Sequence, residues 1–387
     1  MKKVLVLGGG FAGIEVAIEL RKNGVEVTLI SDRDYFYIYP ISIWIPTGEK
    51  TKEEISVPLK DIAKKHGFEV IVDKVIEFNA FSKKVTLDSG KIIDNYEYIV
   101  LALGQDKMQK YGLEHTLSIC GDPKEAVEIH ERLESLIKKG HGKIAMGFGG
   151  NPKDSSAVRG GPIFELLFNI ENYLKIKGVR DKFELTFFAS MPDPGLKMGK
   201  KAPKILKELC EKMSIHVKTG VKIIFFKKEG ILFEDGEEIL SDLIIFIAAG
   251  KGHSVIASSG VPLNEAGFVI TNEYNEVEGF ENVYAIGDST TLLGEKWGAK
   301  QGHLAEVMAR NVAYTLFNKL QNIESKRSYL KHLKILCLMD TGKSAVLVFR
   351  SHKYTQMIPL PFFGHWLKRG WGWYCRNSKL GRFPRLF

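Results

Sequence analysis

A glycine-rich turn between an apolar strand and an amphipathic helix opens the chain and constrains its fold more than any other feature. The strand spans residues 4–7, and the turn reads GGGFAG over residues 8–13. Gly8 allows the tight turn, Gly10 lets the backbone approach a pyrophosphate, and Gly13 lets the helix pack on the strand. The helix N-terminus then faces the negative charge. This pattern predicts a Rossmann-type α/β unit that binds a dinucleotide.

Polar residues that can hold the ribose follow the second strand, residues 25–30. Ser31, Asp32 and Arg33 stand there, about 20 residues after the turn, where a Rossmann unit places its ribose partner. Asp32 is the first choice, because a carboxylate accepts hydrogen bonds from ribose hydroxyls.

Two later strand ends carry small residues, and one carries an acid. A meander of short strands that contains Val75 leads to the strand YIVLALG. This strand ends in Ala102 and Gly104, and such small residues let the backbone come close to a cofactor. VYAIGDST places Gly287 and Asp288 at another strand end. Asp288 can cap a helix, but the recurrence of a strand followed by Gly-Asp favours a carboxylate that receives ribityl hydroxyls.

A second strand and glycine turn begin with KIAMGFGG, but this turn has lost the groups that a dinucleotide needs. Its glycines run into NPKDSSAVRGGP, and the helix over residues 163–174 is entered late. The following strand ends in Ser190 with no acid after it. A nicotinamide-binding unit requires a third glycine that opens the helix and an acid or arginine after the next strand. We therefore assign the retained first site to FAD and expect the second unit to be degenerate.

The tail after Asp340 holds the whole net charge of +9 and many aromatic residues. Its basic residues are Lys343, Arg350, Lys353, Lys368, Arg369, Arg376, Lys379, Arg382 and Arg385. Its aromatic residues include Phe362, Phe363, Trp366, Trp371, Trp373, Tyr374, Phe383 and Phe387. Such a mixture favours the headgroup level of a membrane; nucleic-acid stacking and an ordinary terminus with buried aromatics are the alternatives. We expect peripheral, monotopic membrane contact at the cytoplasmic face and no nucleic acid.

The expected fold class is α/β, with two Rossmann-like domains and a C-terminal amphipathic membrane-docking region. The FAD domain takes residues 1–110 and 255–325, the degenerate domain residues 111–254, and the C-terminal region residues 326–387. The histidines lack companion ligands at metal spacing, so no metal is assigned. Cys210 lies on an apolar helix face and belongs to the core, whereas Cys375 is expected to be a surface thiol. A homo-oligomer is expected.

The chain resembles the group that contains sulfide:quinone oxidoreductases, flavocytochrome c sulfide dehydrogenases and type II NADH dehydrogenases. The resemblance covers nearly the whole chain and rests on GGGFAG, ISDRDYFYIYP, YEYIVLALG, NVYAIGD, AKQGHLAEVMARNVA and LCLMDTGKSAVLVF. With it, the candidate cofactor-binding residues are Gly8, Gly10, Phe11, Ala12, Gly13, Ser31, Asp32, Arg33, Pro40, Val75, Ala102, Gly104, Gly287, Asp288 and Lys300.

Within this group, two residues favour the sulfide enzymes over the NADH dehydrogenases. Lys300 stands where those enzymes carry a lysine beside the flavin, which would stabilise the anionic reduced form; the alternative is a solvated lysine at a helix start. Cys337 falls where they keep a reactive cysteine, and the alternative is an inert strand cysteine.

The chain departs from these enzymes at their second reactive cysteine. The stretch SSAVRGGP has Arg159 about where that cysteine belongs. Cys120 matches a further cysteine that part of the family keeps close to the flavin, so a pair of Cys120 and Cys337 remains open.

The expected function is sulfide oxidation to sulfur or polysulfide, with two electrons passed through FAD to a membrane quinone. Phe349, Phe363 and Trp371 are the candidates to flank the quinone ring. The alternatives are a type II NADH:quinone dehydrogenase and a non-enzymatic flavoprotein whose tail binds a partner.

Overall fold

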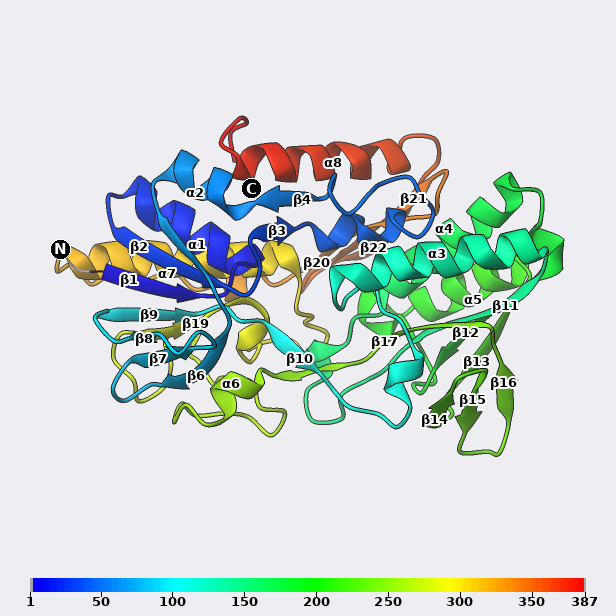
Figure 1. Ribbon diagram of the computed structural model, residues 1–387, viewed down its shortest axis with the longest axis horizontal. Coiled ribbons are helices and arrows are strands. Elements are labelled where there is room, and N and C mark those ends of the chain that lie inside the picture. The colour runs from blue at the N-terminus through cyan, green and yellow to red at the C-terminus, as the bar shows by residue number, and fades with distance from the viewer. Residues whose placement is uncertain (1–2, 386–387) are drawn as a thin grey trace.

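The computed structural model describes residues 3–385, so Phe387 of the tail lies outside the described residues. Two α/β units stand side by side, and C-terminal segments lie across them (Figure 1). No helix within residues 3–385 is long and apolar enough to cross a bilayer.

The first unit is built on a parallel sheet with the strand order β19-β9-β1-β2-β5. Val4 and Val6 of β1 pack with the helices, whereas Leu5 and Leu7 pack with an antiparallel meander on the opposite face. Burial on both faces is typical of strands in parallel sheets. The strands of the sheet are β1 (Lys3–Leu7), β2 (Glu26–Ser31), β5 (Glu69–Val72), β9 (Tyr98–Leu101) and β19 (Val283–Ala285). The helices are α1 (Phe11–Lys22), α2 (Leu59–His66) and α7 (Gly302–Leu320), and the meander is β6 (Val75–Asn79), β7 (Lys84–Leu87) and β8 (Ile92–Ile93).

The second unit repeats the parallel arrangement with the order β13-β12-β11-β17. Its strands are β11 (Gly142–Phe148), β12 (Phe183–Ala189), β13 (Ile215–Thr219) and β17 (Leu243–Ile247). Its helices are α3 (Pro123–Lys139), α4 (Gly161–Ile176) and α5 (Ala202–Lys212), and β14 (Ile223–Lys227), β15 (Gly230–Phe233) and β16 (Glu238–Leu240) form a small antiparallel sheet. Two short antiparallel strands, β10 (Gln105–Lys107) and β18 (Gly250–Gly252), connect the units, and α6 (Ser254–Ala257) follows.

The C-terminal segments form a three-stranded antiparallel sheet and one long helix. The strands are β20 (Ile335–Asp340), β21 (Ala345–Arg350) and β22 (Thr355–Leu360), and the helix is α8 (Gly364–Lys379). Figure 1 shows α8 along one edge of the molecule. It contacts β20, β21 and the 3-10 helix Tyr39–Trp44, which β3 (Tyr35–Tyr37) precedes and β4 (Ser56–Pro58) follows.

The two Rossmann-like units confirm the expected α/β class, while the exact domain boundaries stay a prediction. The first helix begins at Phe11, inside the GGGFAG turn, because Gly10 takes the N-cap position. The expectation for Cys375 was wrong: its side chain is buried on the inner side of α8, beside Lys379.

Candidate functional site

A cavity of about 1750 Å³ lies where the first unit, the second unit and the C-terminal segments meet. The turn after β1, the ends of β9 and β19 and the start of α7 contribute to its wall. So do the loop before α4, strand β20 and helix α8.

The first glycine turn has the shape that a pyrophosphate requires. Gly8 has a φ of +118°, and a Cβ there would lie 2.2 Å from the Ala102 carbonyl oxygen. A Cβ at Gly13 would lie 1.8 Å from the Gly8 oxygen, so α1 packs directly on the turn. A Cβ at Gly10 would meet no protein atom within 4 Å, and no side chain caps the helix at that residue. The backbone N–H groups at the start of α1 are therefore free to bind phosphate oxygens.

Most of the residues predicted to bind the cofactor line this cavity. They are Gly8, Gly10, Phe11, Ala12, Asp32, Arg33, Pro40, Val75, Ala102, Gly104, Gly287, Asp288 and Lys300.

Gly13 and Ser31 do not line the cavity, and both act through packing or hydrogen bonding instead. The Ser31 hydroxyl donates to the Arg33 carbonyl (2.7 Å) and accepts from the Arg33 N–H (3.2 Å). Ser31 therefore shapes the loop that presents Asp32, whose side chain is exposed.

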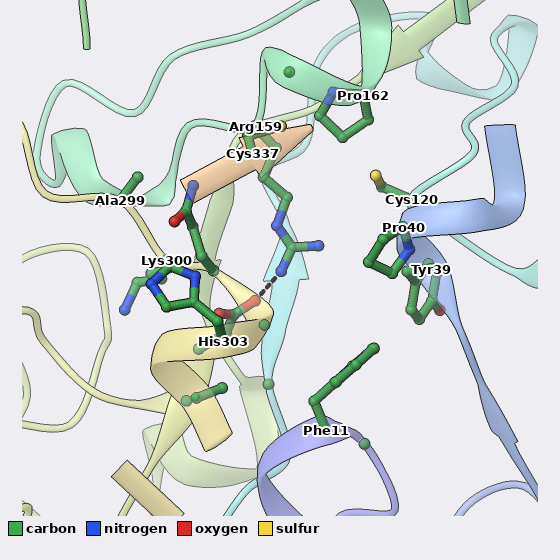
Figure 2. A pocket seen from close by; sticks show the side chains of 18 of the residues that line it. Phe11, Tyr39, Pro40, Cys120, Arg159, Pro162, Ala299, Lys300, His303 and Cys337 are labelled. Atoms are coloured by element: carbon green, nitrogen blue, oxygen red, sulfur yellow. Dashed lines mark hydrogen bonds and ion pairs between the residues drawn. The ribbon is translucent and has the colours of Figure 1, made fainter. Parts of the chain in front are cut away.

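Arg159 lies at the centre of the cavity and forms an ion pair with Asp288 (Figure 2). With the Gln105 amide turned so that its oxygen accepts, that oxygen lies 2.9 Å from Arg159 Nε and 2.8 Å from Nη2. The sequence indicated Arg159 only as the residue that replaces a cysteine. In the structure, Arg159 contacts Asp288 of the first unit and Gln105 of the connecting strand β10.

Lys300 is buried beside the cavity, and its ammonium group is directed away from Arg159 (Figure 2). It donates to the Thr290 carbonyl and lies 4.0 Å from the centre of the Phe268 ring. Burial lowers the pKa of Lys300 to about 7. Lys300 lines the cavity just before α7, which agrees with a cofactor-binding role, while its contact with a flavin stays a prediction.

Both candidate cysteines face the same cavity, as Figure 2 shows. Cys337 on β20 donates a weak hydrogen bond to Glu165 Oε1 (3.7 Å). Burial raises the pKa of Cys337 to about 11. Glu165 on α4 also forms an ion pair with Lys368 of α8, and both side chains are buried.

Glu165, Lys368, Tyr37 and His303 line the cavity as well, and sequence reasoning missed all four. The signal that could have found Glu165 was an acid in the otherwise apolar stretch over residues 163–168. Burial lowers the pKa of His303 to about 4, so the imidazole is neutral near pH 7.

The three aromatic residues predicted to flank a quinone do not lie together. Trp371 lines the cavity, but Phe349 and Phe363 do not. Phe363 precedes α8 and is 73% exposed on the outer surface. Phe349 lies two residues beyond Leu347, which does line the cavity from the same face of β21. The aliphatic side chains of Leu347, Leu360 and Leu367, from the same C-terminal segments, do line the cavity.

The second glycine turn lies outside this cavity, although Gly160 and Gly161 at the start of α4 line it. None of Gly147, Gly149 and Gly150 lines the cavity. A Cβ at Gly147 would lie 2.3 Å from the Phe188 carbonyl oxygen. The Asn151 amide donates to the Gly250 carbonyl (2.8 Å), so the residue after the turn is tied to strand β18.

Among residues 3–385, no group of three or more His, Cys, Asp or Glu side chains is placed to hold a metal ion.

Comparison with known proteins agrees with this site. The family model for pyridine nucleotide-disulphide oxidoreductases matches residues 2–309. The sulfide-quinone reductase of Aquifex aeolicus is 29% identical over 375 residues, covering 90% of this chain and 83% of that protein. The type II NADH:quinone oxidoreductase of Staphylococcus saprophyticus is 25% identical over 321 residues, covering 76% and 75%.

Solved structures show the same architecture. The sulfide:quinone oxidoreductase of Aquifex aeolicus has a TM-score of 0.86 at 26% identity, covering 98% of this chain and 93% of that one. NDH2 from Plasmodium falciparum has a TM-score of 0.78 at 15% identity, covering 99% and 96%, and this likeness concerns the fold alone. These comparisons confirm the resemblance inferred from the sequence motifs and the assignment of FAD as the cofactor. The chain belongs to the pyridine nucleotide-disulphide oxidoreductase family, and it is an FAD-binding oxidoreductase.

Proposed function

We propose that this protein is a peripheral membrane sulfide:quinone oxidoreductase, in which two electrons pass from hydrosulfide through FAD to a membrane quinone. One observation carries the proposal. Cys120 and Cys337 line the same cavity as the open Gly8 turn, whereas the glycines of the second turn do not. This arrangement favours a small donor that reaches a thiol over a dinucleotide held by the second unit. The similarity to the Aquifex aeolicus sulfide-quinone reductase supports this donor and acceptor.

The residues around the first turn would hold FAD. The start of α1 would face its pyrophosphate, Asp32 would bind the adenosine ribose and Asp288 the ribityl chain, since all three line the cavity. FAD supplies the two-electron chemistry when it is bound. The protein contributes a cavity in which thiol, donor and cofactor are close.

The quinone would lie on the side of the cavity formed by α8 and β21. Trp371, Leu347 and Leu360 offer apolar contacts to a ring there, and Leu367 extends this surface toward the outside. Reduction of a quinone takes up two protons, and the buried pair of Lys368 and Glu165 lines the same cavity. Burial lowers the pKa of Lys368, so its ammonium group is a better proton donor than an exposed lysine.

The membrane contact would use aromatic side chains rather than the net positive charge of the tail. Phe362, Phe363, Trp366, Leu367 and Trp373 are exposed at the start of α8 or along it. Most of the basic residues in the tail instead have partners within the protein. Four form ion pairs, which are Lys368 with Glu165, Arg369 with Glu49, Lys379 with Glu15 and Glu306, and Arg385 with Glu15 and Glu19. Two donate to backbone carbonyls, which are Arg350 to Leu196 and Lys197, and Arg376 to Glu54 and Ser56. Of the mixture of basic and aromatic residues expected at the membrane, we therefore assign the main contact to the aromatic ones.

Anaerobic mixing of the FAD-loaded protein with sulfide and with NADH, in parallel samples, tests the proposal. We expect sulfide to bleach the flavin absorbance quickly and added ubiquinone to restore it. A flavin that sulfide leaves oxidised would contradict the proposal.

The alternative is an NADH:quinone dehydrogenase, which the similarity to the Staphylococcus saprophyticus protein favours. It requires a nicotinamide dinucleotide on the second unit, where the Asn151 and Gly250 contact ties the turn to β18. Rapid bleaching by micromolar NADH would establish this alternative.

A further inference from the structure

The ion pair between Arg159 and Asp288 joins the two Rossmann-like units inside the cavity. Arg159 stands just before α4 of the second unit, and Asp288 follows β19 of the first. Their side chains are 29% and 19% exposed, so water and salt screen the pair only in part. Figure 2 shows the Arg159 side chain extending into the space between Lys300 on one side and Pro40 on the other.

The backbone holds Asp288 at this place. Gly287 has a φ of +63°, and a Cβ there would lie 3.1 Å from the Cβ of Ala12, so the residue packs closely against α1. The Gly104 N–H donates to the Ser289 hydroxyl (2.8 Å), which ties the end of β19 to the end of β9. The Asp288 backbone therefore stays at the cavity wall whether or not its ion-pair partner is present.

Gln105 holds the other side of the guanidinium. Its amide oxygen accepts from Arg159 Nε (2.9 Å) and Nη2 (2.8 Å) in the orientation described above. A Cβ at Gly250 of β18 would lie 1.9 Å from this amide, so the glycine leaves the room that the side chain needs. Because an amide carries no net charge, Asp288 alone balances the charge of Arg159 among the ion pairs of residues 3–385.

Lys300 does not provide a second cation for Asp288. Its ammonium group donates to the Thr290 carbonyl and lies 4.0 Å from the centre of the Phe268 ring. Within the described part of the chain, Arg159 is the one basic side chain at ion-pair distance from Asp288. Loss of Arg159 would thus leave an unbalanced carboxylate at the place proposed for the ribityl chain.

We propose that Arg159 is a positioning residue that raises the reduction potential of bound FAD by balancing the charge of Asp288. FAD takes up two electrons and one proton on reduction and so gains one negative charge. The ribityl chain is attached to the ring that takes up the electrons, so a carboxylate that binds this chain acts on the ring at short range. A carboxylate without a partner opposes the added charge, whereas one that is paired with a guanidinium opposes it much less.

Midpoint potentials of the FAD-loaded protein test the inference without sulfide or quinone. Each variant is reduced anaerobically at pH 7 together with a reference dye, and the two spectra give the potential. Arg159→Gln should lower the midpoint potential by about 30 mV, which is a tenfold change in a two-electron equilibrium. Asp288→Asn should raise it, because the guanidinium then lacks its carboxylate. The double variant should return close to the unaltered protein, and Arg159→Lys should preserve most of the potential.

Lys197 offers a matched control from the same cavity. Its ammonium group donates to the carbonyls of Ser155 (2.5 Å) and Gly298 (2.8 Å), and it has no carboxylate at ion-pair distance among the described residues. Lys197→Gln therefore removes a positive charge from the cavity without unbalancing a carboxylate. It should shift the midpoint potential much less than Arg159→Gln does.

Equal shifts in Lys197→Gln and Arg159→Gln would overturn the inference, because the loss of any cation from the cavity would then be sufficient. A lowered or unchanged potential in Asp288→Asn would also overturn it, and this measurement decides the matter if Arg159→Gln does not retain FAD. The inference requires FAD in the first unit but no particular donor. If these shifts appear while sulfide leaves the flavin oxidised, the proposed function fails and the role of Arg159 stands.

Discussion

Lys368 of α8 donates a hydrogen bond to the carboxylate of Glu165 on α4, and both residues are buried. The pair joins the C-terminal helix to the second Rossmann-like unit next to Cys337. Removing one partner of a buried ion pair leaves an uncompensated charge, whereas replacing both partners by apolar residues of similar volume is often neutral.

Lys368→Met should therefore lower the free energy of unfolding by about 3–5 kcal/mol. Denaturant unfolding followed by far-UV circular dichroism measures this loss. The double variant Glu165→Leu with Lys368→Met should recover most of it. If the double variant is as unstable as the single one, the loss arises from packing and not from the unpaired carboxylate.

The start of α8 should make stability depend on pH through His365. Its Nδ1 lies 2.9 Å from Asp340 Oδ2 and its Nε2 lies 3.3 Å from Glu49 Oε2. Hydrogen bonds to Asp340 and then to Glu49 raise the pKa of His365 to about 9. A raised folded-state pKa contributes stability that is fully present below the unfolded value, about 6.5, and is lost as pH rises through 9.

Unfolding measured at intervals from pH 6 to pH 10 should show a decline in stability over this window that His365→Gln removes. His352 is the matched control, because it also contacts an acid, Glu295, but lies in an exposed turn. His352→Gln should keep the decline. An identical pH profile for His365→Gln and the unaltered protein would exclude this role for His365.

Membrane binding should depend on aromatic residues and only weakly on salt. Trp366→Ala combined with Phe363→Ala should weaken binding to liposomes at least tenfold, since burying one large apolar side chain contributes about 1.5–3 kcal/mol. Phe81 is 77% exposed far from α8, on the loop between β6 and β7, and Phe81→Ala is the control. Sedimentation with zwitterionic liposomes at low and high salt measures both effects. Loss of binding at high salt would restore the basic residues as the main contact.

The two cysteines should differ in the reaction with sulfide. Cys120→Ser should slow anaerobic bleaching of the flavin more than Cys337→Ser, because the Cys337 thiol is engaged by the Glu165 carboxylate, whereas no carboxylate accepts from the Cys120 thiol among the described residues. Cys337→Ser should leave bleaching measurable, since this position supplies a protonated group that faces Glu165. Stopped-flow absorbance at the flavin band gives both rates. The reverse order of effects would return the nucleophile to Cys337.

The sequence predicted those parts of the site that depend on local backbone geometry. The turn at Gly8, the acid at Asp32 and the Gly-Asp pair at Asp288 each follow a strand, so their spacing along the chain is enough to place them. Contacts between segments that are far apart in the sequence could not be predicted from spacing along the chain. Glu165 and Lys368 are 203 residues apart and meet only because α4 and α8 both pack against β20. The same folding directs basic residues of α8 inward, which no count of charges in the tail can reveal.

The first glycine turn offers the sharpest test of cofactor binding, because two of its glycines have different reasons to be glycine. A Cβ at Gly8 would collide with the Ala102 carbonyl at a φ of +118°, so Gly8→Ala should disrupt the fold itself. A Cβ at Gly10 would meet no protein atom within 4 Å and would project into the space that the pyrophosphate needs. Gly10→Ala should therefore leave the melting temperature of the FAD-free protein nearly unchanged while sharply reducing its flavin content. Gly370 of α8 also has open space around it, so Gly370→Ala is the control and should retain FAD. Full flavin occupancy in Gly10→Ala would mean that the pyrophosphate does not approach this turn.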